Sequence, residues 1–194
     1  MKKTVLVLLL AAGCRPGEPA ATSGESVSHD LGMLGKVPDF EFLERAGVPV
    51  DREALRGKVW ICSFVFTRCA THCVVMSTEM AALQDEFEDE PDFVVVATTV
   101  DPVYDTPEVL RKHADRYGAK EDRWLWLTGL REDIRKLAHE GMKLAWKADD
   151  PLIHSTRFVL VDRAGNIRGY YELRGEGRMR KMREDIRALL AEKA

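Results

Sequence analysis

One stretch of the chain, residues 57–79, constrains the fold more than any other. It opens with an apolar, β-rich run over residues 59–66 and then places Cys69 and Cys73 four residues apart as a helical pattern begins. A continuous apolar run of this length is typical of a strand buried on both faces of a parallel sheet. The stretch therefore predicts an α/β fold in which a central strand leads directly to two cysteines at the entrance to a helix.

The two cysteines stand where a thiol is chemically active. Backbone N–H groups point outward at the start of a helix, which lowers a thiol pKa and favours the thiolate, the form that binds metals and attacks disulfides. If the chain is already helical at Cys69, the spacing also puts both sulfurs on one helical face. The alternative is an inert structural disulfide or two buried thiols. With only four cysteines in the chain, a functional pair is the better interpretation.

The N-terminus predicts export. Residues 1–3 are a short positive region, and the apolar run over residues 4–12 is too short to span a bilayer. Small residues then precede Cys14, which resembles a bacterial lipoprotein signal in which this cysteine becomes the lipidated first residue of the mature chain. A plain secretory signal with an incidental cysteine is the alternative. Either way the domain is exported, and we expect it on the periplasmic side of a bacterial membrane.

Three regions follow from this interpretation. Residues 1–14 are the signal, and residues 15–36, rich in Pro, Gly, Ser and Glu, are expected to form a flexible tether. Residues 37–194 are expected to form the folded domain. The net charge of −3, with 45% apolar and 31% charged residues, is typical of a globular domain and gives no indication of a nucleic-acid partner.

Along the folded part, periodicity and turn residues predict an order of elements that is characteristic of a mixed sheet. The predicted elements are a hairpin within residues 38–50, a turn or short helix at 51–55, strands at 59–66 and 92–100, helices at 71–88 and 106–117, a strand at 124–127, a helix at 131–139, a further candidate strand at 143–147, a hairpin over 157–171 and a helix at 177–194. Parallel strands come first and an antiparallel hairpin last.

Four segments together resemble the Sco/SenC family of copper-binding proteins. They are FVFTRCATHC (64–73), VDPVYDTPEVLRKHADRYG (100–118), WLWLTG (124–129) and HSTRFVLVDRAGNIRGYY (154–171), in the order in which the family has them. The resemblance covers about residues 37–190. It implies a thioredoxin-like fold, with a central mixed sheet flanked by helices and an extra N-terminal β-hairpin.

The resemblance also implies a metal site. In the family, the two cysteines of a CxxxC motif and a distant histidine bind one copper ion, which here correspond to Cys69, Cys73 and His154. Thiolate sulfur suits Cu(I) and an added imidazole suits Cu(II), so this set could hold both oxidation states. Asp101 matches an acidic residue that the family carries near the site, with Asp105 as the other carboxylate of the segment. We expect Asp101 to support the ligands or to belong to a docking surface, not to bind the metal.

The motif departs from the family pattern at three positions. Ala70 and Val74 stand where the family usually has proline after each cysteine, which relaxes the backbone and restores two N–H donors. His72, inside the motif, is also unusual. It could be a fourth ligand or a base for thiol chemistry, and an exposed loop histidine is the commoner explanation.

Several other residues that could bind metal have simpler interpretations. Met76 and Met80 are one turn apart, which suggests a methionine copper site, but a helix core stripe explains them better. Cys62 alternates within the buried strand and is expected in the core. His113 and His139 have charged neighbours and are expected on the surface.

The function that these features favour is that of a membrane-tethered copper metallochaperone and not of an enzyme. By resemblance, its partner is the copper-bearing subunit of cytochrome c oxidase, with its CuA site, or another copper protein. The alternative is a thiol–disulfide oxidoreductase in which Cys69 attacks and Cys73 resolves a mixed disulfide. A peroxidase-like enzyme on the same fold is a third, weaker interpretation.

Overall fold

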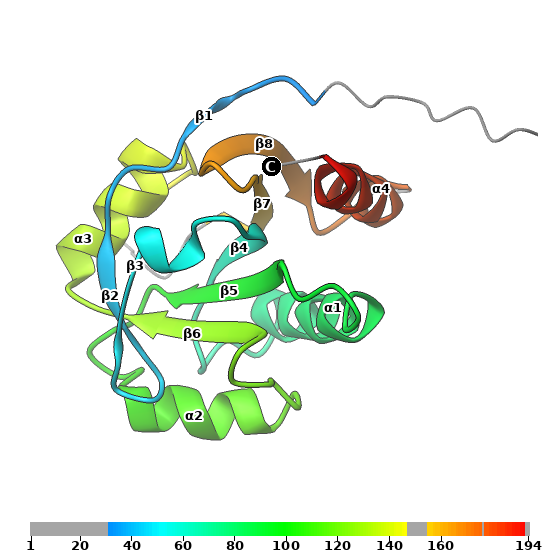
Figure 1. Ribbon diagram of the computed structural model, residues 1–194. Helices are drawn as coiled ribbons and strands as arrows, with labels where there is room; N and C mark the ends of the chain where they lie inside the picture. Colours follow the sequence, from blue (N-terminus) through cyan, green and yellow to red (C-terminus); the bar gives the residue numbers. More distant parts are fainter. Residues whose placement is uncertain (1–30, 147–154, 176, 193–194) are drawn as a thin grey trace, which may run out of the picture.

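The computed structural model describes residues 31–146, 155–175 and 177–192. Within them, strands form a single mixed sheet in the order β1-β8-β7-β4-β5-β6-β2-β3, flanked by helices (Figure 1). The strands are β1 (Gly35–Lys36), β2 (Glu41–Glu44), β3 (Pro49–Asp51), β4 (Val59–Val65), β5 (Phe93–Thr99), β6 (Trp124–Thr128), β7 (Arg157–Val161) and β8 (Asn166–Glu172). The helices are a 3₁₀ turn (Glu53–Leu55), α1 (His72–Glu86), α2 (Pro107–Asp115), α3 (Arg131–Arg135), a π-helix that continues it (Lys136–Gly141) and α4 (Arg178–Ala191).

Parallel strands β4, β5 and β6 form the centre of the sheet. β4 and β5 pair in register from Val59 opposite Phe93 to Val65 opposite Thr99, and both strands are buried along their whole length. The hairpin of β7 and β8 joins β4 on one side, and the hairpin of β2 and β3 joins β6 on the other. Both predicted hairpins and the buried parallel strands are confirmed.

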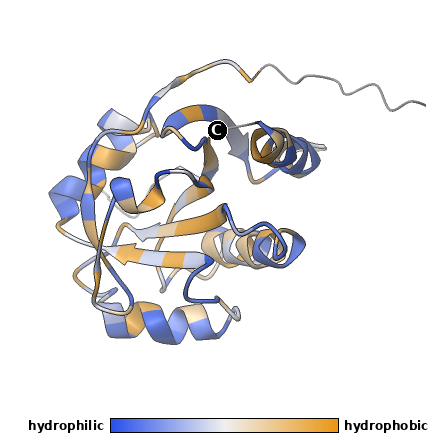
Figure 2. Ribbon diagram, in the orientation of Figure 1, coloured by the Kyte–Doolittle hydropathy of each residue, from blue (hydrophilic) through white to orange (hydrophobic). Residues whose placement is uncertain are grey.

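Alternate residues of β4 face two separate hydrophobic cores. Ile61 belongs to the core beneath α1, α2 and α4, whereas Trp60 and Cys62 belong to the core beneath α3. Apolar residues recur along the central strands and along the helices that cover them (Figure 2). In α1, the predicted stripe that includes Met76 and Met80 is fully buried, and burying each such side chain contributes roughly 1.5–3 kcal/mol. The core positions predicted for Cys62 and for both methionines are confirmed.

Helix α2 begins as its sequence predicts and ends slightly earlier. The side chain of Thr106 accepts a hydrogen bond from the backbone N–H of Val109 at 3.4 Å, and Pro107 is the first helical residue. The helix ends at Asp115, two residues before the predicted end, and Gly118 follows with a φ of 64°. A left-handed glycine is the usual way for a chain to leave a helix.

Two further sequence-based assignments differ from the structure. In residues 143–146, the described part of the candidate strand at 143–147, there is only an isolated bridge at Trp146. Lys143 has a φ of 53°, which is incompatible with a strand. The helix predicted over residues 131–139 runs on to Gly141, with its last turn in the π form. Pairing in the sheet begins at Gly35, where β1 pairs with β8.

His113 is buried, contrary to the surface position that its charged neighbours suggest. It lies three residues after Leu110 on α2, which puts both side chains on the face turned toward the sheet. Its ring contacts Tyr117 and Trp126 at centroid distances of 5.2 and 5.1 Å. Burial lowers the pKa of His113. The neighbouring charged side chains of the helix point outward, and they do not indicate on which face of the helix the histidine lies.

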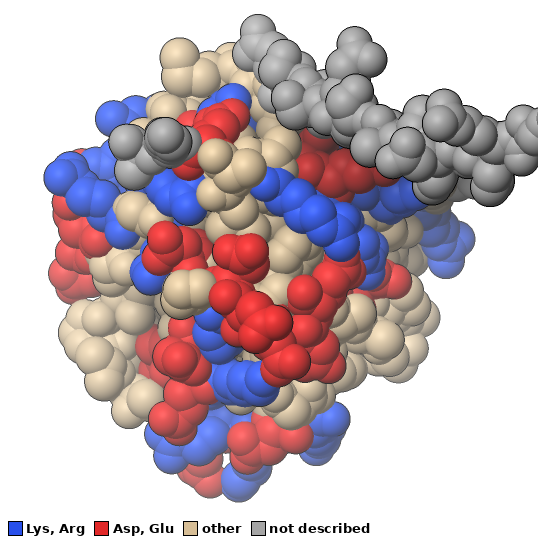
Figure 3. All heavy atoms as spheres, turned by 45° about the vertical axis from the view of Figure 1, so that its right-hand side comes forward, with Lys and Arg blue, Asp and Glu red and all other residues tan. Residues whose placement is uncertain are grey.

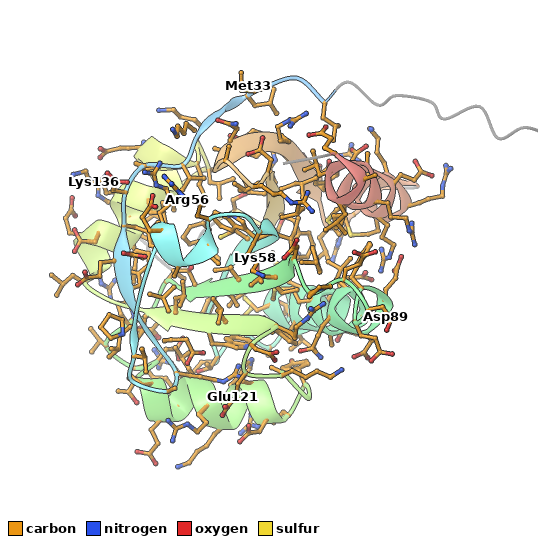
Figure 4. All side chains as sticks on the ribbon, viewed as in Figure 1. Met33, Arg56, Lys58, Asp89, Glu121 and Lys136 are labelled. Atoms are coloured by element: carbon orange, nitrogen blue, oxygen red, sulfur yellow. The ribbon has the colours of Figure 1, made fainter. Side chains whose placement is uncertain are left out.

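Charged side chains of both signs mingle on the surface (Figure 3). At the starts of β4 and β5, Lys58 donates to Asp92 at 3.0 Å, and the exposed Asp89 and Glu121 precede β5 and β6 at the same edge of the sheet (Figure 4). The cysteines follow the opposite end of β4. Among the helices of the described residues, none combines the length and the apolar character that crossing a membrane requires.

Candidate metal and thiol site

Cys69 and Cys73 meet at the junction of β4 and α1. α1 begins at His72, so Cys73 lies in the first helical turn and Cys69 lies in the loop that precedes it. The condition that the chain is already helical at Cys69 is therefore not met. The two sulfurs are neighbours nonetheless, because the backbone N–H of Cys73 donates to Cys69 Sγ and the two side chains share a hydrogen bond. Neither residue forms a disulfide in this structure.

The environments of the two thiols differ strongly. Partial burial opposes ionisation of Cys69, but hydrogen bonds from the backbone N–H groups of Cys73 and Thr71 outweigh it and lower the pKa of Cys69. The Thr71 hydroxyl adds a contact at 3.7 Å. Cys73 is only 2% exposed, and burial raises its pKa to about 12 despite a backbone hydrogen bond from Phe66. In the reduced protein, Cys69 is therefore the thiol that ionises first.

Asp101 is close to the cysteine loop without touching either cysteine. Its buried carboxylate accepts a hydrogen bond from Arg68 Nη2 at 2.6 Å. The Arg68 guanidinium also lies over the ring of Tyr104, at 4.3 Å from its centroid. Asp101 thus acts on Arg68, the residue directly before Cys69.

Asp105 contacts the cysteine loop more directly than Asp101 does. Its side chain is fully buried and accepts hydrogen bonds from the backbone N–H of Thr67 at 3.1 Å, from the Thr67 hydroxyl and from the Thr99 hydroxyl at 2.5 Å. Sequence reasoning preferred Asp101 and missed this arrangement. A signal was available, since Thr67 follows the predicted strand at 59–66 and Thr99 lies near the end of the predicted strand at 92–100, where hydroxyl groups can converge on one carboxylate.

Other predicted site residues are separate from the pair or lie outside the described residues. His72 is exposed as the first residue of α1, and Cys62 belongs to the other hydrophobic core. The predicted ligand His154 and the predicted lipidation site Cys14 lie outside the described residues. In the ranges that the structure describes, no group of three Cys, His, Asp or Glu side chains is arranged to hold a metal ion.

Comparison with protein families identifies the chain. The SCO1/SenC family model matches residues 32–191. The chain belongs to the SCO1/SenC family. A SCO1 protein homolog of Bacillus subtilis (strain 168) is 33% identical over 152 residues, which cover 76% of this chain and 78% of that protein.

Solved structures agree with this assignment. One of them is BsSco, described as a member of the Sco family of cytochrome c oxidase assembly proteins with a disulfide switch. It superposes with a TM-score of 0.72 at 30% sequence identity, and the match covers 83% of this chain and 97% of the BsSco chain. ScoI of Arabidopsis thaliana, solved with copper bound, has a TM-score of 0.65 at 22% identity and covers 79% of this chain and 98% of its own, which establishes a shared fold. The fold of this SCO1/SenC protein is thioredoxin-like, as the sequence predicts.

Proposed function

We propose that this SCO1/SenC protein binds one copper ion through Cys69 and Cys73 and delivers it to a copper protein. The observation that carries the proposal is the contact between two cysteine side chains at the strand–helix junction, in a chain of a family whose relatives include copper-bound proteins. Thiolate sulfur is a soft donor that selects Cu(I) over the hard cations. A partly exposed Cys69 leaves one side of the ion open to an incoming ligand, which transfer between proteins requires.

His154 is the third ligand in this proposal. Only Ser155 and Thr156 separate it from β7, which runs antiparallel to β4. β7 therefore begins at the edge of the sheet where β4 ends and the cysteine loop starts. Two thiolates and one imidazole would hold Cu(I) and Cu(II) alike.

The partner proposed for delivery is the copper-bearing subunit of cytochrome c oxidase, as the description of BsSco suggests. A transfer partner must contact Cys69. Four exposed apolar side chains flank the cysteine loop, two directly after Cys73 and two beside Asp101: Val74, Val75, Val103 and Tyr104. Val103 is 80% exposed. These side chains would be covered when a protein docks over the thiols.

A copper titration of the reduced protein tests the binding proposal. Anaerobic titration with Cu(I), in competition with a chromogenic chelator, is expected to give one equivalent bound to the wild type. Cys69→Ser and Cys73→Ser each remove a soft ligand, so we expect neither variant to compete with the chelator, while Cys62→Ser keeps the wild-type stoichiometry. Tight binding that survives the loss of either site cysteine would refute the proposal.

A second candidate, a thiol–disulfide oxidoreductase, is favoured by one observation. The pKa of Cys69 is lowered and that of Cys73 is raised, as expected of an attacking and a resolving thiol. Absence of tight copper binding in the same titration, together with a Cys69–Cys73 disulfide that exchanges readily with a partner's thiols, would favour this activity over copper delivery.

A lipid anchor at Cys14 completes the proposal. It would hold the domain at the outer surface of the bacterial inner membrane, where export places it. In cells, Cys14→Ser is expected to move the protein from the membrane fraction to the soluble periplasmic fraction. Wild-type protein that is already soluble, or a variant that stays with the membrane, would contradict the anchor.

A further inference from the structure

We propose that Asp105 is the positioning residue of the thiol site, and that its buried carboxylate fixes the loop which presents Cys69 to Cys73. The inference rests on the thiol site proposed above, but it holds for copper binding and for disulfide exchange alike. Asp105 acts on the cysteine loop through its hydrogen bonds to Thr67, and its charge also acts on Cys73.

The carboxylate of Asp105 accepts a backbone hydrogen bond at the point where the pairing of β4 with β5 ends. The ladder between β4 and β5 ends where the Val100 N–H donates to the Val65 carbonyl at 2.8 Å. Beyond that point, the Thr67 N–H has no partner in the ladder and donates instead to Asp105 Oδ2 at 3.1 Å. A buried N–H left without an acceptor is costly. The carboxylate therefore determines the path of the chain two residues before Cys69.

Both carboxylate oxygens of Asp105 take part in the contact. The two oxygens of Asp105 accept from the Thr67 N–H, the Thr67 hydroxyl and the Thr99 hydroxyl. An ionised carboxylate is purely an acceptor and so matches three donors. Asparagine has almost the same shape, but its NH₂ group would face at least one of these donors. Asp105→Asn therefore changes the hydrogen bonding with little change in volume.

Asp105 is itself held firmly. Its backbone N–H donates to the Asp101 carbonyl at 2.9 Å, as does the N–H of Tyr104 at 3.0 Å, so residues 101–105 form a tight turn. The next residue, Thr106, caps α2. The carboxylate is thus anchored to the start of a helix, and this anchorage can transmit rigidity to the cysteine loop.

A second contact between the same two loops is weaker. Arg68 and Asp101 form an ion pair at 2.6 Å, but the Arg68 side chain is 52% exposed. Solvent and salt screen an exposed pair, and such pairs contribute little. The bonds of Asp105 are part-buried at Thr67 and buried at Thr99, so solvent screens them less. Of the two contacts, Asp105 is expected to dominate the position of Cys69.

The test compares Asp105→Asn with Thr67→Val, which removes only the hydroxyl, and with the double variant. Thr67→Ser keeps the hydroxyl and is expected to behave as wild type. Asp162→Asn is the matched control: Asp162 is another buried carboxylate, which accepts from Ala164, Asn166 and Arg168 in the turn between β7 and β8. Asp162→Asn should lower the free energy of unfolding without changing the Cu(I) affinity or the reduction potential of the two cysteines.

Two readouts on folded protein decide the outcome: Cu(I) affinity, and the reduction potential of the Cys69–Cys73 disulfide in thiol buffers without metal. We expect Asp105→Asn to weaken Cu(I) binding about 10- to 100-fold and to shift the potential. Thr67→Val should act in the same direction, and the double variant should be no worse than Asp105→Asn, because both changes break one interaction.

Wild-type values of both quantities in folded Asp105→Asn would overturn the inference, as would effects of equal size in Asp162→Asn. If Asp105→Asn does not fold, Thr67→Val decides by the same two readouts. A wild-type protein that binds no copper would refute the proposed function alone, because the disulfide potential still reports on whether Asp105 positions the thiols.

Discussion

At pH 8, iodoacetamide is expected to modify Cys69 of the reduced protein at least about 30 times faster than Cys73. The pKa of Cys69 lies below its ordinary value of 9.0, whereas burial raises that of Cys73 to about 12, so the thiolate fractions differ about 1000-fold. The more basic thiolate is intrinsically more nucleophilic, with a Brønsted slope of about 0.4–0.5, which reduces the difference to about 30-fold. Burial of Cys73 adds to the preference.

The selectivity of labelling for Cys69 over Cys73 is expected to fall as the pH rises. Modification of Cys69 should rise with pH and level off earlier than that of an ordinary thiol, because its pKa is lowered, while modification of Cys73 should still be rising there, so selectivity falls as pH increases. Mass spectrometry of peptides after timed quenching measures both rates. Buried Cys62, whose pKa burial also raises to about 12, is an internal control for slow labelling. Equal rates in the folded protein, or faster labelling of Cys73, would contradict the asymmetry.

His154→Ala is expected to weaken Cu(II) binding more than about 100-fold, since loss of a ligand should exceed the usual effect of losing a supporting group. The sulfur-to-Cu(II) charge-transfer band should disappear, and the EPR spectrum should change with it. The disulfide between Cys69 and Cys73 should still form, because both thiols remain. This separation of metal binding from disulfide formation distinguishes a ligand from a residue that supports the fold.

Two further histidines serve as controls for this variant. His139→Ala removes an exposed side chain on the π-helix and should leave Cu(II) binding unchanged. His72→Ala tests whether the motif histidine takes part. Unchanged Cu(II) affinity in His154→Ala, with a loss in His72→Ala, would assign the imidazole ligand to His72 instead.

Strand periodicity and turn residues predicted most of the fold because those signals are local. The apolar runs of β4 and β5, the Thr106–Pro107 start of α2 and the hairpin of β7 and β8 each depend on neighbouring residues alone. The wrong boundaries lie where local signals conflict. Lys143 adopts a left-handed conformation inside an otherwise strand-like segment, and no pattern of side chains indicates that change.

The site was predicted in its residue types but not in its supporting contacts. Cysteine spacing and the family resemblance identified Cys69 and Cys73, whose sulfurs do meet. Thr67 and Asp105, which are 38 residues apart, meet in a hydrogen bond, and Thr99 at the end of β5 donates to the same carboxylate. His113 is buried because its face of α2 packs on β6. Such contacts depend on tertiary packing, which sequence pattern alone does not specify.

These contacts suggest how the proposed copper binding could be combined with the proposed copper release. Cys73 is held inside by the helix and the core, whereas Cys69 is partly exposed on a loop. An incoming ligand from a partner would reach the copper from the side of Cys69, and the ion would remain bound to Cys73 until exchange is complete. A rigid loop keeps the two sulfurs together and lowers the cost of ordering them for each new ion.

Copper transfer between two purified proteins tests the central claim most directly. The copper-loaded protein is mixed anaerobically with the apo copper-bearing domain of cytochrome c oxidase, the two are separated, and the copper in each fraction is measured. The account predicts that up to one equivalent of copper leaves the wild-type protein and appears in the oxidase domain. Copper that stays with the loaded protein over hours would contradict the account. So would equal loading of the oxidase domain when the Cys69→Ser variant and free copper replace the loaded wild-type protein.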